Sequence, residues 1–129
     1  MKRKEAREFV MSQAFQIDAS HTWEKNPREL IDRDELGKQY DYALNVLSHI
    51  ITERDKIDSM INEVSTGWTT GRMAKADLAI LRTAVSEILY QEDVPKPVAI
   101  NEAVEMAKLY GTDDSSKFIN AILGKIQEK

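Results

Sequence analysis

The spacing of apolar residues constrains the fold most, because they recur every three or four positions along each long segment of the chain. In residues 3–17, Ala6, Val10, Ala14 and Ile17 make one stripe on a helix. The strict alternation that is typical of a strand occurs nowhere. Five glycines and three prolines in 129 residues leave long stretches free of helix breakers. The sequence therefore predicts an all-α protein.

The predicted architecture is a compact bundle of six to seven helices in one domain, residues 1–129. We expect two small helical sub-bundles, at about 1–65 and 66–129. The apolar phase slips across Glu53–Lys56, which predicts a break between two helices there. The expected helical segments are 3–17, 28–33, 35–65 with that break, 75–91, a helix opened by Pro97, and a last helix capped within 113–115.

Four local predictions follow from the same patterns. Helix 75–91 is expected to be amphipathic, with its apolar stripe inward. Gly111 is expected to end the preceding helix in the left-handed conformation that glycine favours. Trp68 is expected to fill the core. Asn120, between two apolar residues, is expected to be buried and hydrogen-bonded.

Several functional classes are disfavoured. There is no cysteine, and His21 and His49 have no spacing typical of a zinc site, so no metal or cofactor is expected. No phosphate-binding loop or nucleophile motif is present, so an enzyme is not expected. The longest apolar run, Leu78–Leu81, is far shorter than the roughly 20 residues that span a bilayer. A cytoplasmic protein is the simplest interpretation.

Charge is unevenly distributed along the chain. The net charge is −4, which argues against a general polyanion binder. Residues 1–7, however, hold four basic side chains and one acidic side chain, Glu5. A basic tip on an acidic body is compatible with a localised contact to nucleic acid.

Two groups combine basic and aromatic side chains. Arg3, Arg7, Met11 and Phe15 follow one i, i+4 row, and Lys2 and Lys4 flank it. Guanidinium groups bind phosphates, and an aromatic ring can stack on an unpaired base, so the row suits single-stranded RNA. The alternative is a solubilising helix end with Phe15 in the core. A second group surrounds Gly111 and consists of Tyr110, Lys117 and Phe118.

The second half of the chain resembles the NusB family of bacterial transcription antitermination factors. The resemblance extends over roughly residues 68–124, and Ala6-Arg7-Glu8 with Phe15 resembles the family's first helix more loosely. The residues that carry it are Trp68–Met73, Asp77–Ala84, Glu87, Val94-Pro95, Val98–Lys108, Tyr110–Thr112, Ser115, Lys117–Asn120 and Leu123.

The resemblance implies a fold, a function and partners. A NusB-type protein is all-helical, with two small bundles, no catalytic residue and no cofactor. It binds the boxA element of nascent ribosomal RNA leaders as a single strand. It does so with NusE, which is also a ribosomal small-subunit protein, and the pair helps RNA polymerase to pass terminators. On this basis we expect antitermination in ribosomal RNA synthesis.

The resemblance also assigns residues to the expected site. Arg7 matches an arginine of the family's arginine-rich first helix, and Phe15 stands where the family usually has tyrosine. Asp77 matches a position near the NusE-facing surface, and Asp114 matches an acidic residue near the RNA. The usual arginine run is thinned here, and lysine lacks the planar fork. The expected RNA-binding residues are Lys2, Arg3, Lys4, Arg7, Phe15, Arg82, Tyr110, Lys117 and Phe118.

Other interpretations stay open at this point. A NusB-like domain also forms the N-terminal part of some ribosomal RNA cytosine methyltransferases, and such an enzyme needs a further cofactor-binding domain. A protein-only interaction bundle is a third interpretation, in which the acidic body binds a basic ribosomal protein. An exposed face could also be covered by a homodimer when the partners are absent.

Overall fold

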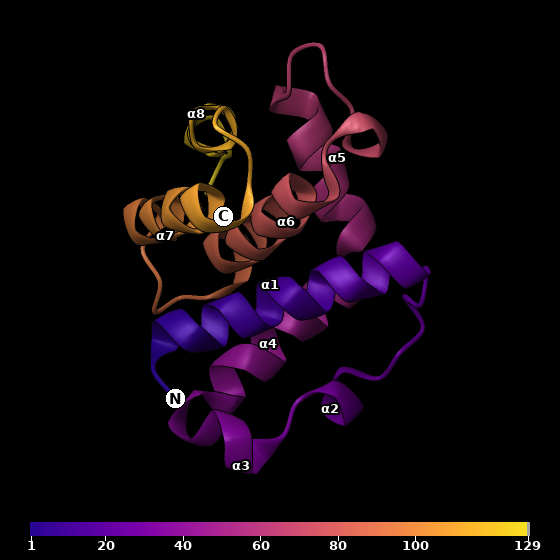
Figure 1. Ribbon diagram of the computed structural model, residues 1–129, viewed down its shortest axis with the longest axis vertical. Helices are drawn as coiled ribbons and strands as arrows, with labels where there is room; N and C mark the ends of the chain where they lie inside the picture. The colour runs from indigo at the N-terminus through magenta and orange to yellow at the C-terminus, as the bar shows by residue number, and fades with distance from the viewer. Residues whose placement is uncertain (129) are drawn as a thin grey trace.

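The computed structural model describes residues 1–128, and in that part of the chain all regular structure is helical (Figure 1). The predicted all-α class is therefore confirmed. Six α-helices have ten or more residues, and they are joined by two one-turn α-helices and two 3-10 turns. The elements are α1 (Arg3–Ser20), α2 (Pro27–Leu30), α3 (Arg33–Leu36), η1 (Gly37–Gln39), α4 (Tyr40–Thr52), α5 (Arg54–Val64), η2 (Thr70–Arg72), α6 (Lys75–Tyr90), α7 (Lys96–Tyr110) and α8 (Ser115–Gly124).

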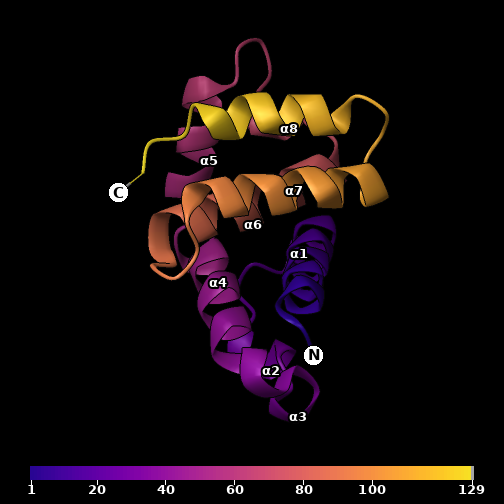
Figure 2. The same ribbon diagram turned by 90° about the vertical axis from the view of Figure 1, so that its left-hand side faces the viewer.

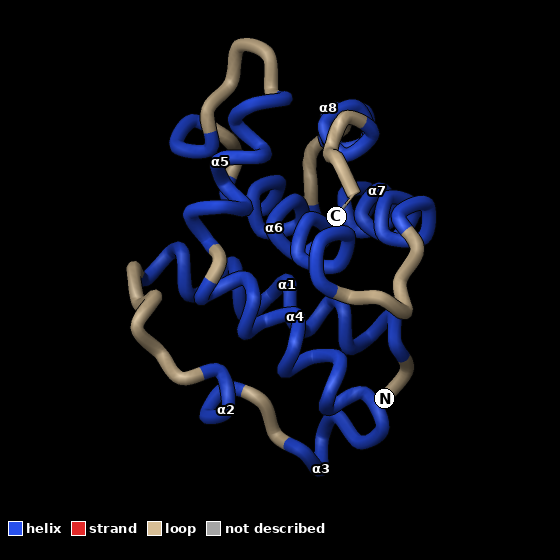
Figure 3. Tube along the Cα trace, turned by 180° about the vertical axis from the view of Figure 1, so that it is seen from behind, coloured by secondary structure: helices blue, strands red, loops and turns tan. Residues whose placement is uncertain are grey.

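Helix α6 is the centre of the fold. It lies among α1, α4, α5, α7 and α8 and contacts each of them (Figure 3). Every residue from Asp77 to Leu89 is buried. The prediction that this helix is amphipathic was wrong, because neighbours cover all of its faces. Its buried polar side chains need internal partners: the Thr83 hydroxyl donates to the Ala79 carbonyl, and the Ser86 hydroxyl donates to the Val46 carbonyl.

The other long helices lie around α6 in two groups. Helices α1 and α4 pack against each other and against α6, while α7 and α8 pack against each other on another side. Figure 2 shows α7 between α1 and α8, so α1 and α8 lie on opposite sides of α7. The division into sub-bundles near residue 65 stays a prediction.

The predicted break in the long helical segment is confirmed at Glu53. This residue leaves the helical conformation, with φ −109° and ψ 21°, and separates α4 from α5. The two short helices before α4 depend on side-chain caps. The Asn26 side chain accepts from the Arg28 amide, and the Asp32 side chain accepts from the Asp34 amide, each at 3.0 Å.

Gly111 does end α7, but not in the left-handed conformation. Its φ of −99° and ψ of −167° are extended backbone, so that prediction was wrong. Glycine is needed here for space, because a Cβ would collide with the Ser115 hydroxyl and with the Ala107 carbonyl. The Ser115 hydroxyl is held in this tight turn by accepting from the Thr112 amide at 2.9 Å.

Two side chains that were predicted to be buried are exposed. Trp68, on the loop between α5 and η2, is 53% exposed. Asn120 lies on the outer face of α8, because Ile119, Ile122 and Leu123 are the residues of that helix in the core. Within residues 1–128, no helix has the length and apolar character to span a membrane.

Candidate nucleic-acid interface

The predicted cations at the start of α1 are divided between solvent and the protein interior. Lys2 and Lys4 are exposed. Arg3 is half-buried: its guanidinium lies 4.1 Å from the centre of the Tyr42 ring, donates to the Gln39 side chain and approaches Asp93 at 3.5 Å. Its charge still lies near the surface, so these three cations form one exposed basic helix end.

Arg7, in contrast, is 3% exposed and belongs to a buried network. Its guanidinium donates to both carboxylate oxygens of Glu87 on α6, at 2.8–3.1 Å, and to Glu102 on α7 at 3.3 Å. The Tyr42 hydroxyl donates to the same Glu87 carboxylate at 2.9 Å. RNA contact by Arg7 stays a prediction, and the engagement of its guanidinium with internal carboxylates argues against it.

The electrostatics of this network follow from burial and pairing. Burial by itself lowers the pKa of Arg7. The hydrogen bonds and the charge of Glu87 outweigh this effect, so the pKa of Arg7 is raised above its ordinary value. For Tyr42, burial and the nearby Glu87 charge both raise the pKa well above its ordinary value. Arg7 therefore stays charged and Tyr42 stays neutral, so the network holds α1, α4 and α6 together as a charge-balanced unit.

The raised pKa of Tyr42 predicts a loss of stability in alkali. Above pH 10 the unfolded tyrosine ionises while the folded one keeps its proton, so the contribution is complete below pH 10 and is lost as the pH rises. Tyr42→Phe is expected to reduce the slope of unfolding free energy against pH between pH 10 and 12, by up to about 1.4 kcal/mol per pH unit. Urea unfolding of both proteins across this range measures it, and equal slopes would contradict it.

Arg82 is also buried and paired. Its guanidinium donates to both carboxylate oxygens of Asp58 on α5, at 2.8 and 2.9 Å, and lies 3.3 Å from Asp18 at the end of α1. It also lies over the Trp23 ring. RNA contact by Arg82 stays a prediction, and the same argument counts against it: its ion pairs tie α1 and α5 to α6.

An open groove lies between α1, the start of α6 and the end of α7. Its volume is about 320 Å³, and its lining residues are Glu8, Met11, Ser12, Phe15, Ala76 and Tyr110. Phe15 and Tyr110 are the exposed rings, at 39% and 50%. The Tyr110 hydroxyl donates to Glu8 at 3.3 Å, which connects α7 to α1 across the groove. The structure thus brings together two of the predicted aromatic residues.

Lys117 and Phe118 lie elsewhere. Both are on α8, which α7 separates from α1, so they do not join Phe15 in one groove (Figure 2). Phe118 instead lines a separate pocket with Trp68. Sequence reasoning missed Trp68 as a surface residue, and it also missed Glu8, Ser12 and Ala76 in the first groove. Gly67 and Gly71 are the signal of a loop from which the exposure of Trp68 could have been predicted.

The two predicted acidic residues differ in exposure. Asp77 is buried in the first turn of α6, and its Oδ1 has no hydrogen-bond partner within the described residues. Asp114 is exposed at the N-cap of α8, although its side chain does not cap the helix. Contact of Asp77 with a partner stays a prediction, and the residue is only 8% exposed.

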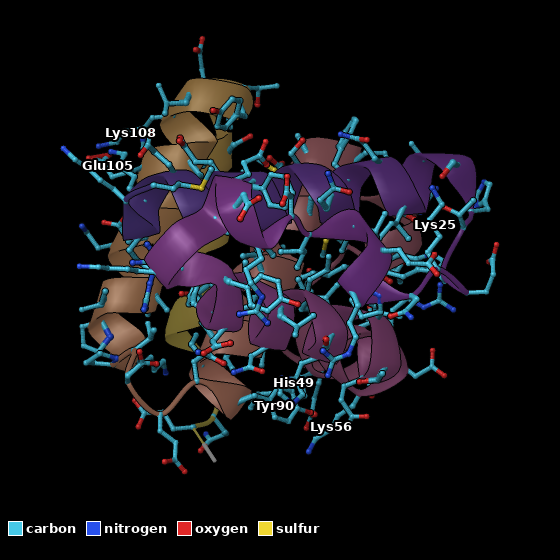
Figure 4. All side chains as sticks on the ribbon, turned by 90° about the horizontal axis from the view of Figure 1, so that it is seen from below. Lys25, His49, Lys56, Tyr90, Glu105 and Lys108 are labelled. Carbon is cyan, nitrogen blue, oxygen red and sulfur yellow. The ribbon has the colours of Figure 1, made fainter. Side chains whose placement is uncertain are left out.

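His21 is exposed and His49 is half-buried. His21 closes α1 in the left-handed conformation, with φ 55°. The His49 ring stacks on Tyr90, with ring centres 4.3 Å apart, and Lys56 lies beside them (Figure 4). The two rings therefore stack on each other, and they lie far from Glu105 and Lys108 on α7 (Figure 4). In residues 1–128 no three carboxylate or histidine side chains are arranged to hold a metal ion.

Comparison with known proteins places the chain among close relatives. A model of the NusB family matches residues 4–128. A protein of Alkaliphilus oremlandii named transcription antitermination protein NusB is 42% identical, covering 100% of this chain and 95% of the relative. A protein of the same name from Agathobacter rectalis is 43% identical, covering 97% and 98%. The solved structure of T. maritima NusB is 31% identical, with a TM-score of 0.87, covering 98% of this chain and 90% of that one.

Proposed function

Because this chain belongs to the NusB family, we propose that it is a transcription antitermination factor that binds boxA-type single-stranded RNA in nascent ribosomal RNA leaders together with NusE. It acts in the cytoplasm as part of the RNA polymerase antitermination complex. It is an adaptor and not an enzyme. The names of the two relatives described above refer to transcription antitermination and not to methyl transfer, which favours this function over a methyltransferase domain.

One observation carries the RNA-binding part of the proposal: the basic end of α1 lies on the same helix as exposed Phe15, and Tyr110 at the end of α7 lines the same groove as Phe15. From Lys4 to Phe15 the helix rises about 16 Å, which is room for more than one nucleotide. The lysines suit phosphates, and the rings of Phe15 and Tyr110 suit stacking on unpaired bases. Glu8 repels phosphate, so bases and not phosphates enter the groove.

The position of the cations also supports a binding role. Lys2, Arg3 and Lys4 lie at the N-terminus of α1, where the helix dipole disfavours positive charge by about 0.3–1 kcal/mol each. Glu5 partly offsets this by accepting from the Lys2 amide at 2.9 Å. Lys2 and Lys4 are exposed and form no salt bridge with a described residue, so their charges are available to a polyanion.

The partner part of the proposal depends on the acidic remainder of the molecule. The net charge of −4, despite the basic tip, suits a basic ribosomal protein such as NusE. We propose the surface around Asp77 as its contact, with Asp114 near the RNA. Phosphate contact through lysines is weaker than through an arginine fork, so RNA binding is expected to depend on NusE. Without partners, a homodimer could cover the aromatic groove.

Phe15→Ala is expected to weaken binding to boxA-like RNA by about 1–3 kcal/mol, because one stacked base loses its platform. Phe15→Tyr keeps the ring and is expected to bind at least as tightly. Lys2→Ala and Lys4→Ala are each expected to flatten the dependence of log affinity on log salt by roughly 0.7, one phosphate contact on a single strand. Fluorescence anisotropy of labelled RNA, with and without NusE, measures both effects.

The matched control is Lys56→Ala, which removes an exposed lysine beside Tyr90, away from α1 (Figure 4). It is expected to leave the salt slope unchanged. If boxA-like RNA is not retained even with NusE, the protein-only bundle replaces this proposal. If RNA is retained with unaltered slopes for Lys2→Ala and Lys4→Ala, the basic end of α1 is not its contact.

A further inference from the structure

Phe118 is one of the RNA-binding residues expected from the family resemblance, and Trp68, to which that resemblance gave no RNA role, lines the same pocket. We propose that Trp68 completes a second stacking site there, which takes one unpaired base of the same RNA strand. This inference rests on the proposed RNA-binding function and extends it to a surface that α7 separates from α1 (Figure 2). Its starting point is the exposure of Trp68, since an indole that is 53% exposed contributes little to the core.

The loop holds Trp68 in this exposed position by several backbone contacts. Gly67 has a φ of +83°, which glycine adopts without strain, and it turns the chain directly before the indole. The Thr70 amide donates to the Asn62 side chain of α5 at 2.7 Å, and the Ser65 amide donates to the Ile61 carbonyl at 2.9 Å. Both ends of the loop are thereby fixed to α5, so the ring is presented in a preorganised way.

A pocket of about 290 Å³ adjoins the indole. One wall comes from the end of α5 and its loop, and the other comes from the face of α8 that carries Phe118, Ile122 and Lys125. Pockets for drug-sized ligands have volumes of roughly 300–1,000 Å³, so this one suits a single planar ring. Trp68 and Phe118 both line it, and an aromatic ring is a platform for any base.

The charge of the pocket favours a nucleotide as its occupant. Lys125 is a lining residue, and Lys117 lies one turn before Ala121 on the same side of α8. Neither lysine forms a salt bridge with a described residue, and no carboxylate lines the pocket. The two lysines suit the phosphate of a nucleotide, and the two aromatic rings suit its base.

A buried hydroxyl adds a polar group to the same pocket. Ser65 is 8% exposed, and its Oγ has no hydrogen-bond partner among the described residues. A buried hydroxyl without a partner is costly, and the edge of a base would supply one. An apolar peptide side chain would leave it unpaired, so the pocket favours a base over a protein segment.

The chain connects the two aromatic sites directly. Tyr110 is the last residue of α7, and Phe118 lies in the first turns of α8, with the tight Gly111–Asp114 turn between them. A strand that leaves the Phe15–Tyr110 groove can therefore follow this turn to α8. Lys117, which the family resemblance assigned to the RNA side, lies at the start of this second site.

The fluorescence of Trp68 offers a direct test. In the full-length Trp23→Phe variant Trp68 is the only tryptophan, and the phenyl ring still lies beneath Arg54 and Arg82. Labelled boxA-like RNA is titrated into this variant with NusE present, using a tryptophan-free NusE. RNA anisotropy and Trp68 emission are recorded together. We expect emission to fall over the same concentration range in which anisotropy rises.

Substitution of Trp68 gives a second measurement. Trp68→Ala is expected to weaken RNA binding about tenfold, the loss of one stacked base, and Trp68→Phe to keep most of the affinity. Both variants are expected to unfold at the wild-type temperature, because the side chain is exposed. Lys125→Gln is expected to flatten the salt dependence, whereas Lys56→Gln is not.

The outcomes separate this inference from the proposed function. If anisotropy rises while Trp68 emission and the affinity of Trp68→Ala stay unchanged, RNA binds but the second site is wrong. If emission responds to NusE alone and not to RNA, the pocket is a protein contact and the inference is overturned. If anisotropy never rises, the proposed function itself fails.

Discussion

Arg7→Ala is expected to lower the free energy of unfolding by about 3–5 kcal/mol, the usual cost of removing one partner from a buried ion pair. The substitution leaves the Glu87 carboxylate inside the protein without its bidentate partner. It also removes the ion pair with Glu102, which connects α1 to α7. Urea unfolding followed by circular dichroism measures the effect as a lower midpoint with an unchanged slope.

The exposed cation on the same helix provides the control. Lys4→Ala is expected to change stability by no more than about 0.5 kcal/mol, because its side chain is in solvent. The double variant Arg7→Met, Glu87→Leu is expected to recover most of the loss, because it removes the fully buried carboxylate together with its partner, and the Glu102 carboxylate that remains is partly exposed to solvent. A loss below about 1 kcal/mol for Arg7→Ala would show that its charge is solvated and free to meet a phosphate.

Arg82→Ala is expected to cost about 3 kcal/mol, the lower end of the range for a buried pair, since Asp58 is partly exposed. The substitution removes two hydrogen bonds between α6 and Asp58 of α5, and it removes one of the ion pairs between α6 and α1, the one with Asp18. Differential scanning calorimetry is the measurement, and a lower unfolding temperature is the expected result.

Lys75→Ala is the matched variant for this second network. Lys75 pairs with the same Asp18 at 3.3 Å, but its side chain is half exposed, so a cost of about 0–1 kcal/mol is expected. At a temperature where both variants are folded, Arg82→Ala is expected to bind RNA as the wild type does. A clear loss of RNA affinity in folded Arg82→Ala would restore the RNA contact that the family resemblance assigned to it.

Both networks explain why the basic residues of α1 and α6 have different roles. Arg7 lies one helical turn after Arg3, but its face of α1 packs on α6, whereas Lys2 and Lys4 lie at the open end of the helix. The cations of one short segment are thereby divided into a structural arginine and surface lysines. Stability measurements and RNA affinities should consequently separate, with Arg7 affecting the first and Lys4 the second.

The periodicity of the sequence determined the helices themselves. Apolar spacing, the phase slip at Glu53 and the prolines around Lys96 are local signals, and each is read within one or two helical turns. The family was likewise recognisable from sequence, because the residue order and spacing over roughly 68–124 belong to the chain alone. The match to the NusB family model confirmed the family, and the structure confirmed the all-α fold.

Tertiary structure alone decided which of these residues face inward. Arg7 and Arg82 are buried because carboxylates more than 20 positions away, Glu87 and Asp58, meet them across helix interfaces. Trp68 is exposed because its loop is fixed to α5 and does not fold back on the core. A sequence records the charge and size of each side chain, but the partner that desolvates it is chosen only when distant helices pack together.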